Sequence, residues 1–240
     1  MRKRSWNWST IQEALRWRGP YISFLLGLRE ILRPVVYWHV FCIFEIDLIH
    51  QPDPKPFADR KVDVKIYAGA GDIETAEGEI VSMGQLEPEE VRSRFSRGDK
   101  AAIAYVDGEP AGYAWMSFTS GAVELAFEVT WIAGPGESIR YDYFVLPKWR
   151  GLRIFSCLNS AILSCARGLG ILRTFSSIST VNRQSMSLAK HDRRTPAMKV
   201  TLVHVRALHW MFQKTTGAPF ESRFLKPEHN PRYRTADQRG

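Results

Sequence analysis

Three basic residues surround a glycine at residues 148–153, where an apolar segment that ends at a proline meets a second apolar segment with helical spacing. Lys148, Arg150 and Arg153 supply the charge, and Gly151 lets the backbone approach a ligand closely. The first turn of a helix exposes backbone N–H groups without intrahelical partners, and the helix dipole favours negative charge there. A strand that enters such a helix through a basic loop therefore predicts a diphosphate-binding site.

The loop lies within the sequence VLPKWRGLRIFSCL, residues 145–158, which resembles the acyl-CoA-binding segment of the GNAT N-acyltransferase superfamily. In that family a strand ending in Val-x-Pro leads through an aromatic residue, Arg-Gly and a glycine-rich turn into a helix, and the amides of the turn hold the pyrophosphate of acetyl-CoA. Residues 174–188, TFSSISTVNRQSMSL, resemble the family's next strand followed by Asn-x-x-Ser/Ala at a helix start. The resemblance implies that acetyl-CoA or another acyl-CoA binds to Phe144, Val145, Lys148, Arg150, Gly151, Leu152, Arg153, Ile154, Phe155, Asn182 and Ser185.

Several positions depart from the family pattern. Glycine is common in the family where this chain has Arg153 and Phe155. Arg153 can still supply a backbone amide and a charge, whereas Phe155 must point away from the ligand or narrow the site. Many members carry a tyrosine in the later helix as general acid, and that position here holds Ala189. The binding of acyl-CoA is therefore better supported than any particular acid–base mechanism.

For an enzyme, the resemblance implies direct transfer of an acetyl or longer acyl group from CoA to an amine of a small molecule or peptide, without a metal. The backbone N–H near Val145 is the oxyanion donor that the family implies. Tyr141 and Tyr143 share the strand parity of Val145, so we expect them on its face, and Asp142 on the other face unless a bulge intervenes. The candidate catalytic side chains, including a general base that acts directly or through water, are Asp142, Glu124, Glu128 and Tyr143.

Two other classes of function stay open. The missing tyrosine and loop glycines suggest a non-catalytic acyl-CoA-binding or interaction module of the same fold. The net charge of +8 at pH 7 favours polyanions, including nucleic acid and anionic membranes. The basic residues are scattered and form no recognised nucleic-acid motif, so we expect no nucleic-acid partner.

The composition is that of an ordinary globular protein, with 45% hydrophobic and 24% charged residues among 240. Cys42, Cys157 and Cys165 are odd in number and lack CxxC spacing, which indicates a reducing compartment and predicts a cytoplasmic protein. No histidine set has metal-ligand spacing, so we expect no metal.

The N-terminal 33 residues are basic, contain three tryptophans and have helical periodicity, with a second helix expected from Tyr21 to Leu32. Charged residues interrupt the apolar run before the roughly 20 residues of a membrane span accumulate. A helical extension packed on the main domain is the preferred interpretation, while peripheral membrane contact through this segment stays open. Homodimer formation also stays open.

The remaining elements alternate between strand and helix patterns, which predicts a mixed sheet in an α/β (α+β) GNAT-like fold with a helical N-terminal extension. The predicted domain covers residues 57–224, preceded by an extension and linker at 1–56 and followed by a polar tail at 225–240. Asp107-Gly108 between two apolar runs predicts a hairpin. The predicted strands cover residues 35–48, 62–70, 100–106, 109–118, 122–133, 138–147, 172–181 and 198–212, and the predicted helices cover residues 86–98, 153–168 and 182–192.

Overall fold

The computed structural model describes residues 24, 27–28, 31–32, 35–50, 62–118, 122–126, 129–191, 195–205, 210–217 and 224–225 of the chain. The chain forms two compact units that alternate along the sequence. Unit 1 contains residues 1–44 and 177–219, and unit 2 contains residues 45–176 and 220–240.

The sheet of unit 2 is mixed, as the sequence predicts. Its strands hydrogen-bond in the order β8 (Arg173–Ser179), β7 (Glu137–Val145), β4 (Glu109–Ser117), β3 (Lys100–Val106) and β2 (Val62–Tyr67). The pairs from β2 to β7 are antiparallel. The pair β7–β8 is parallel, and its register joins Glu137–Arg140 to Arg173–Ser176. β7 therefore continues for five residues beyond this parallel ladder.

The hairpin β3–β4 turns at Asp107-Gly108, which confirms that prediction. The φ angles of the two residues are 53° and 84°. A two-residue hairpin turn with positive φ at both positions matches the right-handed twist of its strands, and Asp-Gly is a favoured sequence for it.

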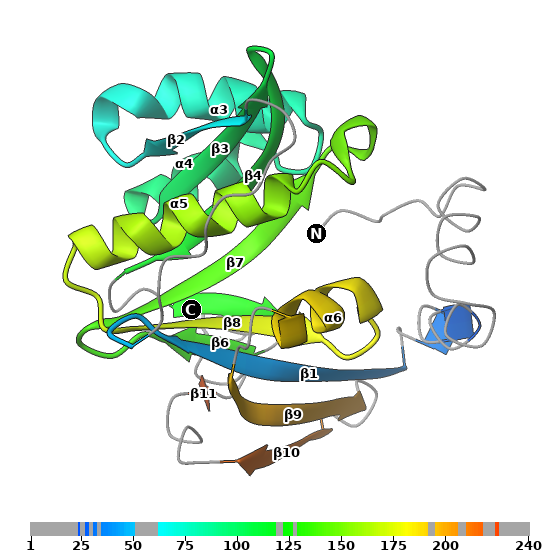
Figure 1. Cartoon of the computed structure of the whole chain (residues 1–240). Coiled ribbons are helices and arrows are strands. Elements are labelled where there is room, and N and C mark those ends of the chain that lie inside the picture. Colours follow the sequence, from blue (N-terminus) through cyan, green and yellow to red (C-terminus); the bar gives the residue numbers. More distant parts are fainter. Residues whose placement is uncertain are drawn as a thin grey trace, which may run out of the picture. The chain divides into compact units, whose positions relative to one another are not determined.

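Helices cover both faces of this sheet (Figure 1). On one face lie α3 (Ile73–Ser82) and α4 (Pro88–Ser96), which pack around buried aromatic residues such as Tyr113 and Trp115. Helix α4 is predicted correctly and has Pro88 in its first turn, where the missing N–H has no intrahelical role. Helix α3 is not among the predicted elements.

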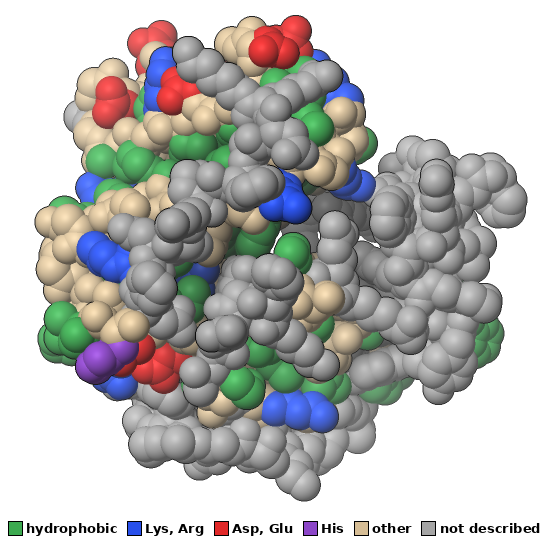
Figure 2. Space-filling model, viewed as in Figure 1, with side chains coloured by type: hydrophobic (Ala, Val, Ile, Leu, Met, Phe, Trp, Pro, Cys, Tyr) green, Lys and Arg blue, Asp and Glu red, His purple; other side chains and the backbone are tan. Residues whose placement is uncertain are grey.

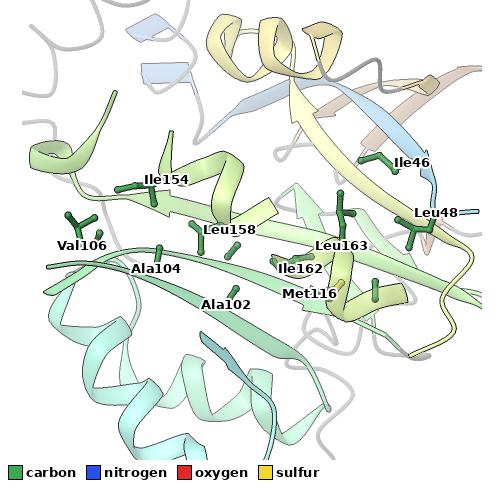
Figure 3. Close-up of a cluster of buried hydrophobic side chains, with 13 residues drawn as sticks. Ile46, Leu48, Ala102, Ala104, Val106, Met116, Ile154, Leu158, Ile162 and Leu163 are labelled. Carbon is green, nitrogen blue, oxygen red and sulfur yellow. The ribbon is translucent and has the colours of Figure 1, made fainter. Parts of the chain in front are cut away.

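On the other face lies α5 (Ile154–Gly168), which the sequence predicts at nearly these bounds. Ile154, Leu158 and Ile162 recur every four residues and point toward the sheet (Figure 3). They meet Ala102 and Ala104 of β3, all fully buried, and these small side chains let the helix lie close to the sheet. This packing fixes the position of the first residue of α5, and therefore of the loop before it.

Unit 1 contains β10 (Trp210–Gly217), β9 (Thr195–Val205), residues 36–44 of β1 (Val36–Asp47) and residues 177–179 of β8, in that strand order, together with α6 (Arg183–His191). The prediction of one strand over 198–212 is wrong, because β9 and β10 form an antiparallel pair. The apolar alternation continues through both strands, and no glycine or proline stands between them to indicate a turn.

A second sheet belongs to unit 2, with strands in the order β11 (Phe224–Leu225), β6 (Val129–Ile132) and β5 (Ala122–Ala126). The single strand predicted over 122–133 is therefore wrong, because β5 and β6 pair with each other in antiparallel fashion. The predicted domain boundary after residue 224 falls within β11, and the boundary after residue 56 lies outside the described residues.

Of the second predicted N-terminal helix, residues 24, 27–28 and 31–32 are helical. The first predicted helix lies outside the described residues. Within the described ranges, no helix is long and apolar enough to cross a membrane. Cys42, Cys157 and Cys165 are free thiols.

Candidate functional site

Strand β7 contains a β-bulge at Asp142 just before the basic loop. The φ angle of Asp142 is 50°, and the register with β4 shifts between Tyr113 and Trp115, so that two residues of β7 lie opposite one of β4. As a result Tyr141 packs with the α3–α4 side of the sheet, and Tyr143 packs with the α5 side. The prediction that Tyr141 shares a face with Tyr143 is therefore wrong, because the bulge reverses the alternation.

Beyond the bulge the strand alternates regularly. Tyr143 and Val145 both pack with the α5 side, as predicted. Phe144 points to the opposite side, where its ring lies 5.7 Å from that of Tyr113. Phe144 can therefore reach a ligand on the α5 side only through its backbone.

The loop itself contains two left-handed residues. A short 3-10 turn covers Pro147–Trp149, Gly151 follows with φ 90°, and Arg153 has φ 55° and ψ 22°. α5 begins at the next residue, and the N–H of Ser156 donates to the carbonyl of Arg153 at 2.9 Å. An arginine thus takes the left-handed conformation where the resembled family often has glycine. That conformation costs a non-glycine residue about 1–2 kcal/mol, and such strain is typical of functional loops.

The basic side chains of the loop differ in their contacts. Lys148 pairs with Glu109 at 2.6 Å, with both side chains well exposed, and lies 5.0 Å above the ring of Trp149. The exposed Arg150 donates from Nε to the carbonyl of Val145 at 3.3 Å, which ties it to the end of β7. This bond holds the guanidinium of Arg150 beside the loop, which makes Arg150 the candidate for recognising an anion.

On the face drawn in Figure 2, the coloured lysine and arginine side chains do not form one broad patch. The loop, with its combination of arginines and helix N-terminus, is therefore the anion site that the local geometry favours.

Phe155 lies against the strand at the start of α5. Its ring centroid is 4.8 Å from that of Tyr143. The hydroxyl of Tyr143 donates to Oδ1 of Asn159 at 3.3 Å, and the same oxygen accepts from the guanidinium of Arg140. Arg140 is only 1% exposed and also donates to Thr174. The position of the Tyr143 hydroxyl is thus set by a buried polar network at the end of the β7–β8 ladder.

Arg140 and Asn159 are not among the site residues predicted from the sequence. The available signal was a charged or amide side chain next to a large apolar residue, Arg140 after Ile139 and Asn159 after Leu158, within a predicted strand or helix. Arg94, whose guanidinium donates to the carboxylate of Asp142 at 2.6 Å, is not among the predicted site residues either. Nothing in the sequence near residue 142 indicates a partner in α4.

The candidate acidic residues lie on different elements where the structure describes them. Asp142 faces Arg94 of α4, on the side of the sheet away from Tyr143. Glu124 belongs to β5 of the second sheet, and Glu128 lies outside the described residues. The identity of the general base stays a prediction.

Asn182 and Ser185 belong to unit 1, where they begin α6. Oδ1 of Asn182 accepts the N–H of Ser185 at 3.1 Å, which is the N-cap bond expected for asparagine before a helix. Ala189 is fully buried and packs with Phe44 and Ile178. The position that would carry the family's tyrosine is therefore part of the core in this chain.

A separate cavity of about 220 Å³ lies between β2 and α5, lined by Val62, Val64, Cys157, Ser160 and Ala161. Burial raises the pKa of the Cys157 thiol, so this residue is suited to packing and not to nucleophilic chemistry. Among the described side chains, no group of three or more His, Cys, Asp or Glu is placed to hold a metal ion.

Comparisons with known proteins give similarity in structure only. No protein-family model and no curated protein matches the chain. A protein of unknown function from Staphylococcus epidermidis has a TM-score of 0.49 at 12% identity, over 75% of this chain and 67% of that one. A tandem GNAT protein from the clavulanic acid biosynthesis pathway has a TM-score of 0.48 at 15% identity, over 75% of this chain and 54% of that one. AAC(6')-Iy, in complex with a CoA bisubstrate analogue, has a TM-score of 0.43 at 17% identity, over 55% of this chain and 89% of that one.

The similar structures thus include GNAT-family acetyltransferases, the superfamily that the loop motif resembles. The chain spans little more than half the length of the tandem protein. The identities and TM-scores are too low for a function to follow from the likeness.

Proposed function

We propose that this protein is an acyl-CoA-dependent N-acyltransferase, and that residues 145–155 bind the diphosphate of CoA. The observation that carries the proposal is the passage from β7 to α5, in which Gly151 and Arg153 are both left-handed and Arg150 is held at the strand end. Successive left- and right-handed residues turn backbone N–H groups toward a common centre, which is how protein loops bind phosphate. The first turn of α5 adds further amides and a favourable dipole.

The end of β7 would hold the rest of the acyl-CoA. Residues 141–145 extend beyond the parallel ladder with β8, so their backbone groups on that edge are suited to hydrogen bonds with an extended substrate. The N–H of Val145 is the proposed donor to the thioester oxygen as it becomes negatively charged.

In the proposed reaction the amine nitrogen attacks the thioester carbonyl, a C–N bond forms, and the C–S bond breaks to release CoA thiolate. One proton leaves the amine nitrogen to a base, and one proton reaches the departing sulfur. Since Ala189 replaces the family's tyrosine, Tyr143 is the proposed proton donor to sulfur, and its hydroxyl would turn from Oδ1 of Asn159 to the departing sulfur to give up its proton. Asp142, Glu124 and Glu128 remain the candidate bases.

The test is turnover on a panel of small-molecule and peptide amines, with acetyl-CoA or a long-chain acyl-CoA as donor and released thiol as the readout. Arg150→Ala should raise the KM for the donor by tenfold or more, because one charge-assisted phosphate contact is lost. Arg92→Ala is the matched control, since Arg92 pairs with Glu77 on the surface of α4. Equal KM values for wild type and Arg150→Ala would contradict the role of the loop.

A non-catalytic acyl-CoA-binding module is the second candidate. Two substitutions favour this candidate. The buried Ala189 stands where the family has its general-acid tyrosine. Phe155, whose ring lies against Tyr143, stands where glycine is common in the family. Two results together would favour this function over the enzyme. The wild-type protein would bind acyl-CoA tightly without turnover on any amine, and the Tyr143→Phe variant would bind acyl-CoA equally well.

A further inference from the structure

Arg94 extends from α4 to the bulge in β7. Its Nη1 donates to the carboxylate of Asp142 at 2.6 Å, and its Nη2 donates to that of Glu90 at 2.8 Å. Arg94 is 7% exposed, whereas the side chain of Asp142 is 34% exposed. An almost buried arginine that donates to two carboxylates holds its partners in a defined geometry more firmly than a surface pair does.

Aromatic rings fix the guanidinium of Arg94 from the sheet side. Its central carbon lies 5.1 Å from the ring centroids of both Trp115 and Tyr141, which is within the range of cation–π attraction. The hydroxyl of Tyr141 donates to Asp99 at 2.6 Å, and Asp99 also pairs with Arg97 at 2.7 Å. Arg94 therefore contacts Asp142 from a rigid site.

The bulge determines which face of the sheet each following residue occupies. With the bulge, Tyr143 and Val145 face α5. Without it, and with Tyr141 still opposite Trp115, regular pairing would place Tyr143 opposite Tyr113 on the α3–α4 side. The residues that enter the basic loop would all exchange faces. The bulge is also unfavourable in itself, because Asp142 has φ 50°.

We infer that Arg94 is a positioning residue: through Asp142 it holds the bulge that turns Tyr143, Val145 and the following loop toward acyl-CoA. This inference rests on the proposed function. Arg94 packs on Trp115 and Tyr141 on the α3–α4 side of the sheet, whereas Tyr143 and Val145 lie on the α5 side. Its effect on binding is transmitted by the backbone of β7.

The test compares Arg94→Met with Arg92→Met, which removes the exposed Arg92–Glu77 pair from the same helix. Two quantities are measured: the affinity for acetyl-CoA, and the amide hydrogen exchange of residues 141–146. Arg94→Met should weaken acetyl-CoA binding by tenfold or more and speed the exchange, while Arg92→Met should change neither. Wild-type affinity in Arg94→Met would overturn the inference.

Asp142→Asn is the second variant, because asparagine tolerates the left-handed conformation as aspartate does but offers Arg94 no negative charge. It should also weaken binding, and the double variant Arg94→Met/Asp142→Asn should be no weaker than the worse single variant. Additive losses would show that Arg94 acts by another route and would overturn the inference. If Arg94→Met proves unstable, Asp142→Asn alone still tests the inference, because unchanged binding in that variant would overturn it.

The two proposals can fail separately. If folded wild type binds no acyl-CoA, the proposed function fails. Exchange at residues 141–146 then still decides whether Arg94 holds the bulge, and unchanged exchange in Arg94→Met would refute that part as well.

Discussion

Gly112 offers a direct test of how tightly the end of β7 is packed. It lies on β4 opposite Val145. A Cβ atom added there would be 2.5 Å from the carbonyl oxygen of Phe144 and 3.1 Å from Cα of Val145. Both neighbours are backbone atoms, so no change of rotamer can relieve the contact. Gly112→Ala must therefore push β7 away from β4.

The required displacement follows from the distances. Ordinary contact begins near 3.4 Å, so the oxygen of Phe144 must move by about 0.9 Å, the difference between 3.4 and 2.5 Å. Overpacking of this kind destabilises proteins by about 1–3 kcal/mol. The shift also moves Val145, whose carbonyl accepts Arg150, so acetyl-CoA should bind about tenfold less tightly, equivalent to about 1.4 kcal/mol.

Gly78→Ala is the matched control. Gly78 lies inside α3, and no atom lies within 4 Å of a Cβ added there. Alanine should therefore raise the free energy of unfolding by about 0.5–1 kcal/mol. Urea unfolding followed by tryptophan fluorescence measures both variants, and calorimetric titration measures acetyl-CoA affinity. A Gly112→Ala protein as stable as wild type would refute the packing argument.

Three further predictions concern titration and the loop. Burial and a neighbouring acidic charge raise the pKa of Tyr141. Above pH 10 this tyrosine ionises in the unfolded chain but not in the native protein, so it should lower the free energy of unfolding by about 1.4 kcal/mol per pH unit. Urea unfolding at several pH values should show that Tyr141→Phe loses this part of the slope, and an identical slope in the variant would contradict the prediction. Burial also raises the pKa values of the thiols of Cys42, Cys157 and Cys165. These thiols should therefore react slowly with iodoacetamide at pH 7.5 in the native protein, and faster above pH 9. Rapid alkylation of any of them at pH 7.5, detected by mass spectrometry, would disprove the prediction. In Gly151→Ala the new Cβ has open space around it, but the residue must keep φ 90°. Backbone strain alone should therefore lower the free energy of unfolding by about 1 kcal/mol, measured by thermal unfolding. An unchanged midpoint would show that the loop relaxes.

Local signals in the sequence predict much of the sheet and its main helix. The hairpin at Asp107-Gly108 and helices α4 and α5 depend on turn residues, a proline in the first turn and regular apolar spacing, all of which act within a few residues. Helix α3 is harder to predict, because Gly78 interrupts a segment with few large apolar residues. The hairpins β5–β6 and β9–β10 have no glycine or proline between their strands, so each reads as one strand.

The candidate site is predictable only in part. The basic loop follows from the sequence, and the start of a helix after Asn182 follows from an asparagine in a favourable capping position. The left-handed conformation of Gly151 and Arg153 is seen only in the structure. The bulge at Asp142 does not follow from the sequence, because its partner Arg94 lies 48 residues away in the chain. The same holds for the contact of Phe155 with Tyr143, which depends on how α5 packs against β7.

The most direct test of the central proposal is calorimetric titration of the full chain with acetyl-CoA, CoA and a long-chain acyl-CoA, for wild type and Arg150→Ala. We predict binding at one site, weakened tenfold or more by Arg150→Ala, with no change in its unfolding temperature because the side chain is exposed. Absence of binding of all three compounds to folded wild type would contradict the proposal that the β7–α5 loop is a diphosphate site.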